Sequence, residues 1–205
     1  MKNLLATIIT LFIVISIVTA QTKEVLIIGT MHEVPKITKK AYQPLYKKAL
    51  AYAPDQIYVE TAMPNDSLSW DYLKNGYSTS IRQFAKISDS LKVHYNFDRI
   101  AFDKALAKDL EQMSQADLKI LVKGFAYLRD KPNFIYYKLI KEYGLNFKKH
   151  FRYETQDLTG KLAIALKHKK VFATDDQQTN GEFHENWSKC TIATAKTKYL
   201  SLIHI

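Results

Sequence analysis

The stretch Glu-Val-Leu-Ile-Ile-Gly-Thr-Met-His-Glu, residues 24–33, decides the fold that the sequence predicts. Four consecutive apolar residues, Val25 to Ile28, favour a buried β-strand, and Gly29 ends the run. A polar loop with an imidazole and a carboxylate follows at once. Buried parallel strands present functional side chains at their carboxyl ends, and His32 is therefore the first candidate for a functional centre.

A second strand is predicted at residues 55–61, where a short run of β-forming residues leads into Glu60. Residues 38–53 between the two runs have the apolar spacing of a helix, with lysines on the other face. A β-strand, helix and β-strand in this order indicate a parallel pair whose carboxyl ends lie at the same edge. We therefore expect His32 and Glu60 to face one pocket.

A third strand is predicted at residues 169–174, and it runs directly into Asp175 and Asp176. Residues 64–150, which precede it, have mostly helical patterns, and a helix is also expected at 157–168. The sequence therefore predicts an α/β fold: a βαβ-based, mostly parallel sheet with a large helical insertion that caps the carboxyl edge of the strands. The helices expected within that insertion cover residues 66–73, 80–91, 99–113, 115–129 and 133–143.

The amino terminus has the pattern of an export signal. A nearly unbroken apolar run from Leu4 to Val18 follows Lys2, and Val18-Thr19-Ala20 is typical of a cleavage site before Gln21. The run is shorter than the roughly 20 residues that a membrane-spanning helix needs. We therefore expect residues 1–20 to be a signal peptide and residues 21–205 to form one domain in the periplasm or outside the cell, with membrane contact only if the signal remains uncleaved.

The chain is basic, with 30 Lys and Arg against 20 Asp and Glu. Such a charge suggests anionic partners, but the lysines are scattered over the predicted helices, which is typical of solvated faces. No nucleic-acid-binding motif is present, and we expect the partner to be a small molecule or a peptide rather than a nucleic acid. Cys190, the one cysteine, cannot form a disulfide within the chain.

Three strand ends together suggest a site built from His32, Glu60 and Asp175. An imidazole and carboxylates could bind a divalent ion that polarises a carbonyl and activates water, with Asp176 as a further ligand. Without a metal, His32 could act as a general base that one of the acids orients. The acids could also simply cap the helices that follow their strands, and the pattern does not separate these alternatives.

The three strand-end segments, residues 25–32, 56–60 and 171–176, resemble motifs of the TraB/GumN/Tiki-like superfamily, and most closely those of an uncharacterised exported bacterial branch. The resemblance implies an α/β fold with two Gly-x-x-His motifs and a glutamate at the site. The first motif falls on Gly29 and His32, and the glutamate falls on Glu60. Tiki members are metal-dependent proteases, whereas a related branch resembles erythromycin esterases, which are thought to use histidine without a metal.

The second Gly-x-x-His motif has no match, since His204 follows an apolar run without a glycine three residues earlier. We expect the matching histidine to lie in a missing carboxyl-terminal portion. The prediction for the whole chain is thus an exported hydrolase of peptide or ester bonds, which works either with a divalent metal or without one. The alternatives are an envelope protein that binds a ligand or metal without turnover, and an inactive, truncated relative.

Overall fold

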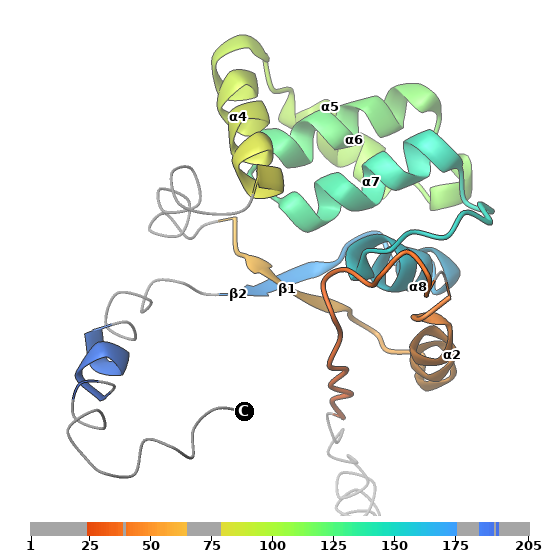
Figure 1. Ribbon diagram of the computed structural model, residues 1–205. Helices are drawn as coiled ribbons and strands as arrows, with labels where there is room; N and C mark the ends of the chain where they lie inside the picture. Colours follow the sequence, from red (N-terminus) through yellow and green to blue (C-terminus); the bar gives the residue numbers. More distant parts are fainter. Residues whose placement is uncertain (1–23, 39, 65–78, 176–184, 191, 193–205) are drawn as a thin grey trace, which may run out of the picture.

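The computed structural model describes residues 24–38, 40–64, 79–175, 185–190 and 192. The fold is mixed α/β, as predicted (Figure 1). In chain order the elements are α2 (Gln43–Tyr52), β1 (Tyr58–Ala62), α4 (Thr79–His94), α5 (Arg99–Ala107), the 3-10 turn η1 (Leu110–Gln112), α6 (Gln115–Tyr127), α7 (Lys131–Tyr143), the π-helical turn η2 (Thr155–Gly160), α8 (Lys161–Ala165) and β2 (Phe172–Asp175).

The described sheet consists of β1 and β2, which pair in parallel at the centre of Figure 1. Tyr58 pairs with Phe172 and Val59 with Ala173, but Ala62 pairs with Asp175. Three steps along β1 therefore match two steps along β2, which is an irregularity of the β-bulge kind. The second and third predicted strands thus exist and are parallel, and each begins three residues later than expected.

The predicted first strand is wrong, because the structure has no strand at Val25–Ile28. These residues alternate in burial: Val25 and Ile27 are 81% and 87% exposed, while Leu26 and Ile28 are half-buried. Apolar residues form a strand only where a neighbouring backbone accepts their hydrogen bonds. The first backbone bridge after this segment is at Glu33, which pairs with Tyr153. The predicted βαβ unit over residues 24–60 is therefore absent from the described fold.

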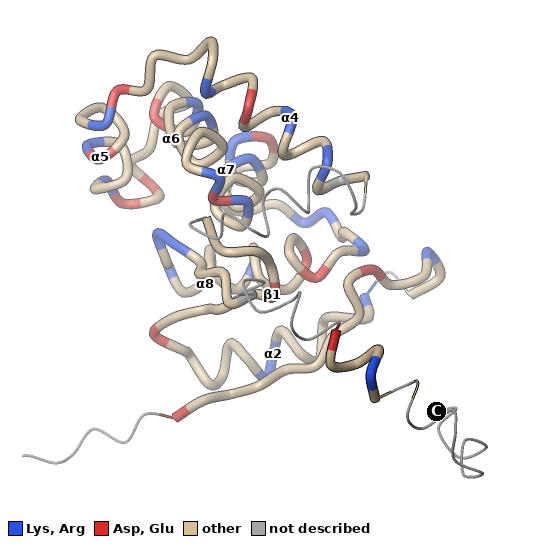
Figure 2. Tube along the Cα trace, turned by 90° about the vertical axis from the view of Figure 1, so that its left-hand side faces the viewer, with Lys and Arg blue, Asp and Glu red and all other residues tan. Residues whose placement is uncertain are grey.

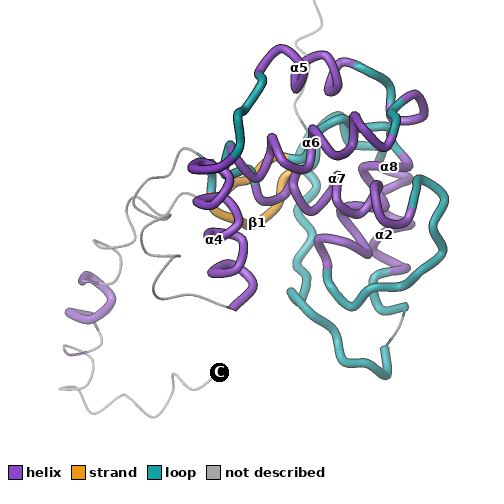
Figure 3. Tube along the Cα trace, turned by 90° about the horizontal axis from the view of Figure 1, so that it is seen from above, coloured by secondary structure: helices purple, strands orange, loops and turns teal. Residues whose placement is uncertain are grey.

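The helices lie on both sides of the strands. Figure 1 shows α4 to α7 above β1 and β2, and the turned view of Figure 2 places α2 on the opposite side. Seen from above, α6 and α7 run side by side with α5 next to α6 (Figure 3). Figure 2 also shows lysine and arginine distributed along several helices, in agreement with the scattered basic residues of the sequence.

Local capping explains where α6 begins and α7 ends. Ser114 and Asp117 form a reciprocal capping box at the start of α6, and Gly144, with φ of 74°, ends α7. The helix expected over 99–113 is interrupted after Ala107, because Lys108 becomes extended and its Nζ lies 2.8 Å from both carboxylate oxygens of Asp117. The helix expected at 66–73 lies outside the described residues.

The helix expected over residues 157–168 is also different in the structure. The segment begins as the π-helical turn η2 at Thr155 and continues as α8 only to Ala165. Lys167 then has φ of 59°, in the left-handed region, which is incompatible with a continuing right-handed helix. The segment is helical, as predicted, but it ends earlier than expected, and its first turn is a π-helix, which is wider than an α-helix.

The core lies between α5, α6, α7 and the strands. Its fully buried members include Leu121 and Phe125 of α6 and Tyr137 of α7, and the rings of Phe125 and Tyr137 stack with centroids 5.3 Å apart. A Cβ atom added at Gly124 would lie 2.2 Å from Cδ2 of Phe102. Glycine at this position therefore permits the close approach of α5 and α6.

Helix α7 holds the entrance to β2 through polar side chains. The buried Asn133 donates from Nδ2 to the carbonyl of Val171 at 2.8 Å and accepts from the Val171 amide at 3.0 Å. The hydroxyls of Tyr136 and Tyr137 donate to the carbonyls of His168 and Lys169. Side chains thus satisfy the backbone groups ahead of β2 in the way that a neighbouring strand otherwise would.

We expect Asn133→Ala to lower the free energy of unfolding by about 2–4 kcal/mol, because it leaves a buried amide and a buried carbonyl without partners. Urea denaturation followed by circular dichroism measures the change. Asn96→Ala, at an exposed position between α4 and α5, is the matched control and should change stability by less than about 0.5 kcal/mol. Equal effects of the two substitutions would contradict the role of Asn133.

Candidate functional site

The loop that contains His32 is held by a segment 122 residues away in sequence. Glu33 and Tyr153 form an antiparallel bridge, the amide of Val34 donates to the carbonyl of Arg152 at 2.9 Å, and Arg152 Nη2 lies 2.5 Å from Glu33 Oε1. A weaker backbone contact of 3.4 Å joins the amide of Glu154 to the carbonyl of His32. These contacts fix the backbone at His32 and at the two residues that follow it.

The imidazole of His32 contacts the carboxylate of Glu154. His32 Nδ1 lies 2.7 Å from Glu154 Oε1, and the hydroxyl of Thr30 donates to the other carboxylate oxygen. The Glu154 side chain is only 16% exposed, whereas that of His32 is 75% exposed. A fixed, largely buried carboxylate therefore orients an imidazole that faces solvent.

Electrostatics favour the protonated form of His32. The hydrogen bond with Glu154 is the main cause of a raised His32 pKa, followed by the charge of the same carboxylate. Partial burial lowers the pKa, the negative charge of Glu60 raises it, and the positive charge of Lys131 lowers it. His32, Glu60 and Lys131 are thus close enough for their charges to interact, and burial lowers the pKa of Lys131 itself.

The predicted residues occupy different places in the structure. Glu60 lies within β1 and is exposed, and Asp175 is the last residue of β2, where its backbone pairs with Ala62. The carboxyl ends of these two strands meet as predicted. His32 lies near enough to Glu60 for their charges to interact, but it comes from the loop pinned at Glu33 and not from the end of a paired strand. Asp176 and the terminal His204 lie outside the described residues.

Glu154 is the residue that sequence reasoning missed. It follows Arg152 and Tyr153 without a preceding apolar run, so it has none of the strand-end context that singled out Glu60 and Asp175. A carboxylate just before a helical pattern is the only local signal, and it is shared by many helix starts. The pairing with His32 arises from the bridge between Glu33 and Tyr153.

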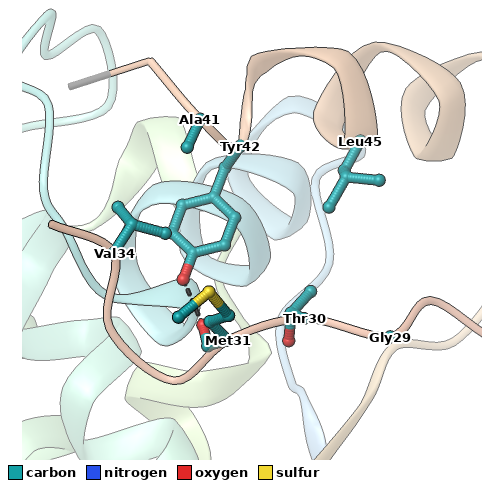
Figure 4. Close-up of a pocket in the computed structure, with 7 residues that line it drawn as sticks. All are labelled: Gly29, Thr30, Met31, Val34, Ala41, Tyr42 and Leu45. Carbon is teal, nitrogen blue, oxygen red and sulfur yellow. Dashed lines mark hydrogen bonds between the residues drawn. The ribbon is translucent and has the colours of Figure 1, made fainter. Parts of the chain in front are cut away.

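An open cavity of about 460 Å³ adjoins Thr30 (Figure 4). Its wall is mainly apolar and comprises Met31, Val34, Ala41, Tyr42 and Leu45. Figure 4 shows the Tyr42 ring between Val34 and Met31, with its hydroxyl donating to the Met31 carbonyl. The cavity could take a small apolar group beside the residue that contacts Glu154.

The histidine and carboxylate pair suits two chemistries. A carboxylate on one ring nitrogen sets the tautomer, which leaves Nε2 to act as a base or to bind a metal. Among the side chains that the structure describes, no three His, Cys, Asp or Glu come together in a group that could hold a metal ion. The predicted ligand set of His32, Glu60, Asp175 and Asp176 stays a prediction.

Comparison with known proteins assigns no family to the chain. A scan against protein-family models, a search of curated proteins and a search of solved structures each found no match. Within the described residues, none of the helices combines the length and apolar character required to cross a bilayer. Function is therefore argued from the geometry of the site and from the sequence.

We expect a His32 pKa above 6.5 in the native chain, and Glu154→Gln should lower it because the substitution removes both a hydrogen bond and a negative charge. Proton and nitrogen NMR of the imidazole during a pH titration measures both values. Glu60→Gln should lower the pKa by less, since Glu60 acts through its charge alone. If Glu154→Gln left the pKa unchanged, the contact between the two side chains would not exist in solution.

Proposed function

We propose that the chain is an exported hydrolase that cleaves a peptide or ester bond, with His32 as general base and Glu154 as the residue that positions it. The observation that carries the proposal is the 2.7 Å contact between His32 Nδ1 and Glu154 Oε1. A carboxylate on one nitrogen of an exposed imidazole is an arrangement that prepares the other nitrogen for proton transfer.

In the proposed mechanism, Nδ1–H of neutral His32 donates to Glu154, and Nε2 removes a proton from a water molecule. The water oxygen attacks the substrate carbonyl, and a tetrahedral intermediate forms. Glu154 stabilises the imidazolium, which then returns its proton to the departing oxygen or nitrogen as the bond to the carbonyl carbon breaks. General acid–base catalysis of this kind typically contributes about 10²- to 10⁴-fold in rate.

Glu60 and Asp175 complete the proposed site. The negative charge of Glu60 favours the imidazolium that forms when His32 takes up a proton. In the metal-dependent form of the proposal, His32, Glu60, Asp175 and Asp176 are the ligands, and a bound divalent ion would polarise the carbonyl. The contact between Glu154 and Nδ1 is also typical of a metal-binding histidine, so it supports both forms.

The surroundings of His32 support a substrate that has an apolar group. We propose that the helical insertion, residues 64–150, caps the strand ends, and the influence of Lys131 at the start of α7 on His32 supports this. The cavity beside Thr30 would bind the apolar part of the substrate. Export rests on the signal pattern in residues 1–20, and membership of the TraB/GumN/Tiki-like superfamily rests on the strand-end motifs.

His32→Ala should reduce hydrolysis by at least about 100-fold, because it removes the general base. A panel of p-nitrophenyl esters and fluorogenic peptides, followed by kcat/KM, measures the loss, and circular dichroism verifies the fold. His94→Ala, at an exposed position on α4, is the matched control and should leave the rate unchanged. Binding of these substrates by the wild-type chain without turnover would favour the non-catalytic alternative.

The rate should also depend on the protonation of His32. A general base must be neutral, so kcat/KM should rise with pH through an inflection above 6.5, and Glu154→Gln should move that inflection to lower pH. A pH profile from 5 to 9 on the best substrate of the panel measures both, with the range chosen about the ordinary histidine pKa. An inflection that stays fixed in Glu154→Gln would assign the titration to another group.

Chelation separates the two forms of the mechanism. If His32 acts as a base without a metal, hydrolysis should survive dialysis against EDTA, and elemental analysis should find no stoichiometric divalent metal. Loss of activity on chelation, with recovery on adding Zn²⁺, would instead establish the metal-dependent form.

A further inference from the structure

A second and larger cavity, of about 740 Å³, lies away from the His32 loop. It is bounded by α2, η1, the segment 145–150, η2 and α8, and it shares no lining residue with the cavity beside Thr30. Its volume is within the range of roughly 300–1,000 Å³ that is usual for small-molecule sites. The residues of the candidate hydrolytic site do not line it.

The acidic groups of this cavity already have basic partners. Asp157, whose side chain is 4% exposed, lies 2.5 Å from Lys161 Nζ through Oδ1, and the same oxygen accepts from the amide of Phe151 at 3.2 Å. Glu111 lies 3.0 Å from Nζ of Lys167, which does not line the cavity. Neither carboxylate therefore needs a cationic ligand to balance its charge.

The basic groups are less fully balanced. Lys148, His150 and Lys161 line the cavity, and His150 Nδ1 is 3.7 Å from Asp157 Oδ2, which is too long for a hydrogen bond. In the part of the chain that the structure describes, no carboxylate forms an ion pair with Lys148. Lys161 pairs with Asp157 and Lys167 pairs with Glu111, so among the charged groups of this cavity the positive charge of Lys148 is the one that no described carboxylate balances.

The remaining wall includes an apolar part beside the polar side chains of Gln43 and Asn146. Tyr46, Leu145 and Ile164 are half-buried side chains that pack against the main core, and Leu110 is buried. Asp157 in the π-helical turn η2 and Lys161 at the start of α8 also line the cavity, and π-helical turns, although rare, occur often at functional sites. An apolar wall beside an unbalanced lysine is suited to an amphipathic anion.

We propose that this cavity binds a small organic monocarboxylate: its hydrocarbon part would lie against Tyr46, Leu110 and Leu145, and its carboxylate would bind Lys148, His150 and Lys161. This inference does not depend on hydrolytic activity at His32. The two sites are connected through the chain, because Asp157 follows Glu154 by three residues.

Isothermal titration calorimetry of the purified chain with octanoate, octan-1-ol and octylammonium tests the proposal. Octanoate should bind at least about tenfold more tightly than octan-1-ol, because only the carboxylate forms charged hydrogen bonds, and octylammonium should not bind. Equal affinity for all three compounds would overturn the proposal, because it would indicate apolar binding without recognition of charge.

Single substitutions test whether octanoate binds in this cavity. Lys148→Gln should weaken octanoate binding about threefold, as expected for one exposed ionic contact, and should leave octan-1-ol binding unchanged. Lys119→Gln, which removes an exposed lysine from α6, is the matched control for net charge and should have no effect. Ala165→Phe, at an exposed position of the cavity wall, should weaken both ligands at least about tenfold by filling the space. Unchanged affinity in Ala165→Phe would place the binding elsewhere and overturn the proposal.

Discussion

The antiparallel contact between residues 32–34 and 152–154 is the constraint on which both sites depend. The bridge from Glu33 to Tyr153 joins two segments that are remote in sequence, and the ion pair of Arg152 with Glu33 reinforces it. On one side of the bridge the contact sets His32 against Glu154. On the other side the chain enters η2, which supplies Asp157 to the larger cavity. A shift of one residue in this pairing would separate His32 from its carboxylate.

The difference in exposure between His32 and Glu154 explains the character of that pair. Thr30 and His32 occupy the two oxygens of Glu154, so a largely buried carboxylate keeps hydrogen-bonding partners. The imidazole gains an orientation while most of its surface stays in contact with solvent. Raising the His32 pKa favours the protonated state, which makes the group a stronger base at the cost of a smaller neutral fraction near neutral pH.

Helix α7 packs against α6 and also contacts both strands. Its first residue, Lys131, lowers the pKa of His32 through its positive charge. Further along α7, Asn133 binds the backbone of Val171, and Tyr136 and Tyr137 donate to the carbonyls just before β2. Parallel strands at the edge of a small sheet have unpaired backbone groups, and here side chains from a helix satisfy several of them. The two-stranded sheet is thereby stabilised by an element that also contributes to the candidate site.

Elements that depend on short-range signals could be predicted from the amino-acid sequence. The helix patterns over 115–129 and 133–143 predicted the start of α6 and the end of α7, where the structure shows the local caps Ser114 and Gly144. The runs before Glu60 and Asp175 predicted β1 and β2 to within three residues. The state of Val25–Ile28 depends on tertiary packing, since a strand needs a partner that no local pattern specifies. The pairing of His32 with Glu154 depends on the same packing. Because these two residues are 122 positions apart, their contact depends on how the whole chain packs. The local sequence around His32 or around Glu154 could therefore not reveal it.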